Sequence, residues 1–107
     1  MVAQSFRNVH MGNIPPFAVI TGASRGIGAE YARALAAQGY DLLLVARDKT
    51  RLDQVGEDLH HAYSLQVWTE ALDLSRPNES LTLYHLAQSC RPHVSLLVNN
   101  AGFGMYG

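Results

Sequence analysis

The stretch Thr21-Gly22-Ala23-Ser24-Arg25-Gly26-Ile27-Gly28 decides the fold of this chain. The apolar residues 17–20 before it predict a buried strand, and the alanine-rich residues after it predict a helix. Its glycines allow the backbone to turn tightly and leave room for a bulky ligand. A helix that begins at this turn directs free backbone N–H groups at an anion. The stretch therefore predicts a strand–turn–helix unit that binds the pyrophosphate of a dinucleotide.

Strands and helices alternate along the rest of the chain. The sequence predicts strands at residues 17–21, 41–46, 65–72 and 94–99, and helices at about 26–38, from 48 or 50 to about 62, and at 77–90. The continuously apolar residues 42–46 are typical of a parallel strand that is covered on both faces. Alternation with short connections indicates an α/β domain with a parallel sheet and helices on both faces.

Length and composition allow one small domain and exclude several classes of partner. A net charge of −1 over 107 residues, with no basic stripe, argues against nucleic-acid binding. The apolar runs are too short to cross a membrane, so we expect no membrane partner. The only cysteine, Cys90, cannot form an internal disulfide, which fits a cytoplasmic location. Residues 1–16 are polar and end in Pro15-Pro16, so we expect a flexible leader followed by the domain at 17–107.

Two arginines predict the choice of dinucleotide. Arg47 directly follows the second predicted strand, beside the expected place of the adenosine ribose, and Arg25 lies in the glycine turn. Guanidinium groups converging there suit a 2′-phosphate, whereas an acidic residue would bind the free ribose hydroxyls of NAD. We therefore expect NADP(H), with NAD(H) the less favoured cofactor. The alternative is that both arginines are solvated surface charges.

Polar or small residues also follow the third and fourth predicted strands. The carboxylate of Asp73 can accept a hydrogen bond from the adenine amino group, and the backbone N–H of Leu74 can donate to the ring. The alternative for Asp73 is a turn or helix-capping residue. The run Asn99-Asn100-Ala101-Gly102 allows close approach of the backbone to a ligand, or is an ordinary turn.

Metal and other nucleotide sites are not expected. Adjacent His60 and His61 diverge by about 100° on a helix, so they cannot easily share a metal ion. No Gly-Lys pair follows Gly22, which disfavours a nucleoside triphosphatase. Many methyltransferases have an acidic residue at the end of the second strand. This chain has Ala46-Arg47 there, which argues against a methyltransferase.

Taken together, these segments resemble the short-chain dehydrogenase/reductase family, and the resemblance covers residues 17–107. It implies a Rossmann-type, doubly wound parallel sheet, truncated after its fourth strand, with the order 3-2-1-4. It also implies that Ser24 contacts phosphate, Arg25 the ribose phosphate and Ile27 the nicotinamide end. By the same resemblance the remaining cofactor-binding residues are Gly22, Gly26, Gly28, Arg47, Asp73, Leu74, Asn100, Ala101 and Gly102. Asn99 is expected to brace the sheet.

The resemblance implies an oxidoreductase that transfers hydride between NADP(H) and a carbonyl or alcohol substrate. The family's catalytic serine and Tyr-x-x-x-Lys pair follow the Asn-Asn-Ala-Gly run, and no residue here matches them, since Lys49 is the only lysine. We therefore expect no catalytic residue in the chain, and a missing substrate pocket and missing dimer helices. The alternatives are an inactive NADP(H)-binding module or an unstable fragment. An unpaired edge on the last strand would favour a marginal monomer or a self-associating chain.

Overall fold

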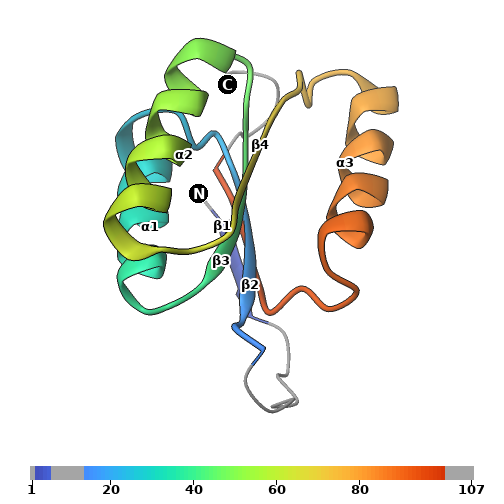
Figure 1. Cartoon of the computed structure of the whole chain (residues 1–107). Coiled ribbons are helices and arrows are strands. Elements are labelled where there is room, and N and C mark those ends of the chain that lie inside the picture. Colours follow the sequence, from blue (N-terminus) through green and yellow to red (C-terminus); the bar gives the residue numbers. More distant parts are fainter. Residues whose placement is uncertain (1, 6–13, 101–107) are drawn as a thin grey trace.

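A computed structural model describes residues 2–5 and 14–100 as one five-stranded sheet with helices on both faces (Figure 1). The strands are β1 (Val2–Ser5), β2 (Phe17–Thr21), β3 (Asp41–Ala46), β4 (Val67–Ala71) and β5 (Leu96–Asn99). Their spatial order is β1-β5-β2-β3-β4. The four strands from β2 onward are mutually parallel, and this confirms the expected 3-2-1-4 arrangement.

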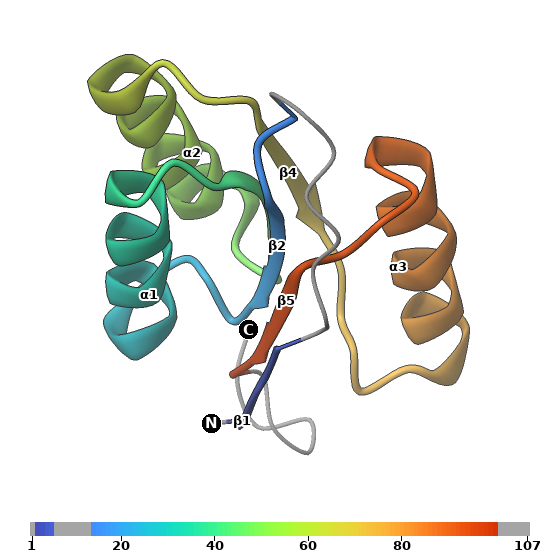
Figure 2. The ribbon, with the colours of Figure 1, turned by 90° about the horizontal axis from the view of Figure 1, so that it is seen from below.

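Three helices connect the parallel strands, and their residue ranges agree closely with those predicted from the sequence. They are α1 (Gly26–Ala37), α2 (Lys49–Tyr63) and α3 (Pro77–Cys90). Figures 1 and 2 show α1 and α2 together on one face of the sheet and α3 alone on the other. The structure therefore has the doubly wound α/β arrangement in which parallel strands are buried from both sides.

The central strands carry the core. Every residue of β2 and β3 is buried, and the side chains alternate between two apolar clusters. On the α1 and α2 face, Ile20, Leu42 and Leu44 pack against small and aliphatic helix residues. On the α3 face, Phe17 and Leu43 belong to the second cluster. Burial of this kind stabilises a fold by about 25 cal/mol per Å² of apolar surface.

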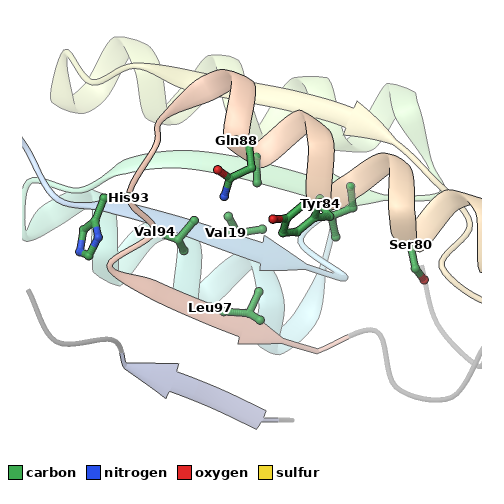
Figure 3. A pocket seen from close by; sticks show the side chains of 9 residues that line it. Val19, Ser80, Tyr84, Gln88, His93, Val94 and Leu97 are labelled. Carbon is green, nitrogen blue, oxygen red and sulfur yellow. The ribbon is translucent and has the colours of Figure 1, made fainter.

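Helix α3 leaves an apolar groove of about 490 Å³ on its own face of the sheet (Figure 3). Val19 and Leu97 come from the sheet, and Leu83 and Ala87 from the helix. Tyr84, also at this groove, is 60% exposed. One helix therefore covers this face of the sheet incompletely.

Strand β1 was not expected from the sequence. Residues 1–16 were expected to be a leader without regular structure, but Val2–Ser5 forms a strand antiparallel to β5. Val2 lies opposite Asn99, and Ser5 lies opposite Leu96. The outer edge of β5 is therefore paired, and the expectation of a bare edge there was wrong. The local sequence gives no strand signal, because the pairing depends on a backbone edge more than ninety residues away.

A partly buried ion pair between Arg91 and Asp41 ties the carboxyl end of α3 to the sheet. The carboxylate of Asp41, on a residue only 3% exposed, accepts hydrogen bonds from Arg91 Nη2 and from the backbone N–H of Gln66. The Arg91 guanidinium carbon lies 5.3 Å from the centre of the Trp68 ring, which itself meets Phe17 edge-on. These contacts lie at the amino ends of the parallel strands, opposite the glycine turn.

Candidate cofactor-binding site

The glycine turn, Arg47, Asp73 and Asn100 all lie at one edge of the sheet. Each directly follows, or lies within two residues of, the carboxyl end of a parallel strand. Ligands of open α/β sheets bind outside this edge, where the strand order reverses. Here the reversal falls between β2 and β5, because the chain runs outward from β2 to β3 and β4 and then crosses to β5 on the other side of β2. The topology therefore brings the predicted residues of four separate segments to one edge.

The glycine turn has the backbone that the sequence predicted. Gly22 and Gly26 have φ angles of +62° and +61°, which L side chains rarely adopt. A Cβ on Gly28 would lie 2.8 Å from the carbonyl carbon of Gly22 and closer still to its oxygen. The first turn of α1 is therefore packed directly on the loop, and only glycine leaves space for this contact.

A polar clasp fixes the turn to the end of β5. Asn100 Nδ2 donates to the carbonyl oxygen of Gly22 at 3.2 Å, and Asn100 N donates to Thr21 Oγ1 at 2.9 Å. Thr21 Oγ1 in turn donates to Asn99 Oδ1 at 3.0 Å. Asn99 therefore braces the sheet, as the resemblance implied. Thr21 was not among the predicted residues, although a threonine that ends a buried strand is a signal for such a contact.

The start of α1 is prepared for an anion. Its N-cap residue, Arg25, is extended and provides no side-chain cap, and the first turn carries no acidic residue. Ser24 is 3% exposed, and its Oγ has no hydrogen-bond partner in the described part of the chain. A buried hydroxyl without a partner is costly, and an anionic acceptor at the helix N-terminus would satisfy both it and the free N–H groups.

A groove of about 630 Å³ runs from this helix start between α1 and α2. Ser24, Arg25 and Gly26 line it from the turn and α1, and Arg51 lines it from α2. Ile27 also borders the groove and is 59% exposed. The groove thus joins the glycine turn to the beginning of the second helix.

Arg47 and Asp73 lie on neighbouring strand ends. The Arg47 side chain is exposed, and neither Arg25 nor Arg47 makes a salt bridge with another described residue. Asp73 Oδ1 accepts from Ser75 Oγ at 2.6 Å and from Ser75 N at 3.0 Å. These hydrogen bonds, helped by the charges of Arg76 and Arg47, lower the pKa of the Asp73 carboxyl. Asp73 is thus ionised at neutral pH and already serves as a turn residue, the alternative that the sequence left open.

Three further predicted positions, Leu74, Ala101 and Gly102, have different outcomes. Leu74 packs against the apolar cluster beneath α3, so its side chain has a structural role, while a role of its backbone N–H stays a prediction. Ala101 and Gly102 lie outside the described residues.

Within the residues that the structure describes, no group of three or more His, Cys, Asp or Glu could hold a metal ion. None of the described helices has the length and apolarity that a membrane span requires.

Known sequences match most of the chain. Residues 16–107 match the profile of a family described as short chain dehydrogenase. The chain is 41% identical over 90 residues to the very-long-chain 3-oxoacyl-CoA reductase of Phaeosphaeria nodorum, which covers 80% of this chain and 26% of that protein. The corresponding reductase of Kluyveromyces lactis is 38% identical over 87 residues, covering 80% and 25%. The chain thus spans about a quarter of the length of these curated relatives.

Solved structures show the same fold. L-sorbose reductase from Gluconobacter frateurii, complexed with NADPH and L-sorbose, has a TM-score of 0.79 at 34% identity and covers 82% of this chain and 34% of that chain. A short-chain dehydrogenase from Sphingobium yanoikuyae in complex with NADPH has a TM-score of 0.66 at 40% identity, covering 74% and 31%. Because the family profile matches residues 16–107, nearly the whole of this chain, the chain belongs to the short chain dehydrogenase family.

Proposed function

We propose that this chain is the cofactor-binding part of an oxidoreductase that transfers hydride between NADP(H) and a carbonyl or alcohol substrate. The observation that carries the proposal is the start of α1, where an unpartnered buried hydroxyl, free N–H groups and glycines with positive φ meet. Solved relatives complexed with NADPH support a nicotinamide cofactor that carries the 2′-phosphate. The bound nicotinamide supplies the hydride chemistry, and the protein supplies binding and orientation.

In this proposal different residues of the chain contact different parts of the cofactor. Gly22, Gly26 and Gly28 shape the turn that receives the pyrophosphate, and Ser24 donates its hydroxyl hydrogen to a phosphate oxygen. Arg25, from the glycine turn, and Arg47, from the end of β3, attract the 2′-phosphate. The remaining contacts come from Ile27, Asp73, Leu74, Asn100, Ala101 and Gly102.

The chain by itself is proposed to bind cofactor without reducing a carbonyl. None of its residues matches the serine or the Tyr-x-x-x-Lys pair of the family pattern. The relatives with which it shares 38–41% identity are named as very-long-chain 3-oxoacyl-CoA reductases, so a 3-oxo thioester is the favoured substrate class for the whole protein. The competing candidate is a module that binds NADP(H) without any turnover. It is favoured by the same observation, that no residue of this chain matches the catalytic serine or the Tyr-x-x-x-Lys pair.

A titration of the 107-residue chain tests the proposal. Binding of NADPH and NADH is followed by nicotinamide fluorescence, with circular dichroism to confirm that the protein is folded. We expect saturable NADPH binding, weaker NADH binding and no oxidation of NADPH when a 3-oxoacyl thioester is added. A folded chain that binds neither dinucleotide would contradict the proposed function. Carbonyl reduction by the chain alone would contradict the division between binding and catalysis.

A further inference from the structure

A short turn connects the end of β4 to the start of α3, and it carries the residues that are predicted to contact adenine (Figure 1). The N–H of Leu72 still donates to a neighbouring strand end, to the carbonyl oxygen of Ala46 at 3.0 Å. From Asp73 the chain leaves the sheet, and Arg76 N donates to the Asp73 carbonyl oxygen at 3.1 Å, which closes a four-residue turn. The backbone N–H of Asp73 therefore needs a partner outside both the sheet and the turn.

Glu79, in the first turn of α3, supplies that partner. Its Oε1 accepts from Asp73 N at 2.7 Å, and its side chain is only 28% exposed. Its Oε2 lies 3.7 Å from Arg76 Nη1, and Arg76 Nε lies 3.6 Å from Asp73 Oδ2. Because the Arg76 side chain is 72% exposed, these two ion pairs contribute little. The short hydrogen bond from Asp73 N to Glu79 is thus the contact that fixes the start of the turn.

The fixed turn presents one acceptor and one donor side by side. Asp73 Oδ1 accepts from the Oγ and the N of Ser75, so among the described residues Oδ2 has only the loose contact with Arg76. Leu74 N donates to no residue in the described part of the chain. A carboxylate oxygen and a backbone N–H from adjacent residues are therefore available together. Adenine has the complementary pair, an amino donor beside a ring-nitrogen acceptor.

We propose that Glu79 is a positioning residue that sets the selectivity of the cofactor site for adenine. This inference rests on the proposed function, because it needs a dinucleotide whose adenine lies at this turn. Glu79 itself touches no cofactor atom; it holds the backbone of Asp73, and so the relative placement of the Asp73 carboxylate and the Leu74 N–H. Hypoxanthine has an oxygen and a ring N–H where adenine has the amino group and the ring nitrogen. A fixed turn leaves its own polar groups unpaired against hypoxanthine, whereas a loosened turn can rearrange and accept either base.

The test compares NADPH with its analogue that carries hypoxanthine in place of adenine, and nicotinamide fluorescence gives both dissociation constants. For the parent chain we expect NADPH to bind at least about tenfold more tightly, as fits a hydrogen bond to a charged group. In Glu79→Ala this ratio should fall by roughly three- to tenfold, because the turn is no longer fixed. Glu79→Gln should keep the ratio within about twofold of the parent value, since the amide oxygen can still accept from Asp73 N.

Two further variants separate positioning from a general loss of stability. Arg91→Met removes the ion pair with Asp41 at the opposite end of α3, and it should leave the ratio within about twofold of the parent value. Glu79→Asp keeps a negative charge in the first turn of the helix, which favours a folded protein. Its shorter side chain should nevertheless lower the ratio as Glu79→Ala does, and this variant decides the test if Glu79→Ala does not fold.

Three results would overturn the inference. They are a parent chain that binds the two cofactors equally well, a ratio that Glu79→Ala leaves unchanged, and a fall in Glu79→Gln or Arg91→Met as large as that in Glu79→Ala. Binding of neither cofactor by the folded parent chain would instead contradict the proposed function itself.

Discussion

Asn100 Nδ2 and the carbonyl oxygen of Gly22, separated by 78 residues in sequence, are joined by a hydrogen bond of 3.2 Å. The same asparagine donates its backbone N–H to Thr21, so two of its groups hold the end of β2 and the beginning of the turn. The shape of the glycine turn is therefore set from outside the turn, by the residue that follows the last strand.

Loss of this side chain should loosen the turn. We expect Asn100→Ala to lower the free energy of unfolding by about 1 kcal/mol, the usual value of one such hydrogen bond, and to weaken NADPH binding. Chemical denaturation and the fluorescence titration measure the two effects. Asn78→Ala in exposed α3 is the control and should alter neither quantity appreciably. Unchanged stability and affinity in Asn100→Ala would show that the clasp is not needed.

A methyl group on Gly28 should be poorly tolerated. Its Cβ would meet the carbonyl group of Gly22, which is backbone and cannot be moved without reshaping the turn. We expect Gly28→Ala to cost roughly 1–3 kcal/mol of folding free energy, as overpacking usually does, and to abolish measurable NADPH binding. Thermal denaturation and cofactor titration report these losses.

Gly56 provides the comparison for Gly28. A Cβ there would lie 2.7 Å from Thr69 Cγ2, an atom that Thr69→Ser removes while the hydroxyl that binds Asp53 is retained. We expect Thr69→Ser to recover much of the stability lost in Gly56→Ala. Equal losses in Gly28→Ala and in the Gly56→Ala, Thr69→Ser double variant would contradict the distinction between a backbone and a side-chain obstacle.

The Asp41–Arg91 pair predicts strong coupling between its members. In Arg91→Met the buried carboxylate loses its counter-charge, and since Arg91 is itself a quarter exposed we expect a loss of about 2–3 kcal/mol, toward the low end for buried pairs. Asp41→Asn added to that variant should restore part of the stability, because the amide oxygen can still accept from Gln66 N. A double-mutant cycle by urea denaturation measures the coupling, and additive losses would refute it.

Ser64 predicts a stabilising substitution. It ends α2 with a φ of +56°, in the left-handed region that costs a residue with a side chain more than it costs glycine. We expect Ser64→Gly to raise the free energy of unfolding by roughly 0.5–1 kcal/mol. Ser80→Gly, inside α3, should lower it by a similar amount. If both changes destabilise the protein, the backbone argument is wrong.

Local patterns predicted the parallel sheet and its helices well, because each element carries its own signal. The apolar run at 42–46, the glycines of the turn and Pro77 at the start of α3 each depend on near neighbours in sequence. The contacts that escaped prediction join distant residues, such as Thr21 with Asn100, and Arg91 with Asp41 and Trp68. Whether the predicted cofactor residues bind as proposed stays a prediction for the titrations.

The antiparallel pairing of β1 along β5 lets the first residues of the chain protect the edge of the sheet from pairing with other strands. A strand edge accepts one partner at a time, and here Val2–Ser5 pairs with all four residues of β5. Any other strand, from the same polypeptide or from another, reaches that edge only by displacing these residues. Removal of a few amino-terminal residues would therefore expose the backbone N–H and C=O groups of β5, and a strand of another molecule could then pair with them.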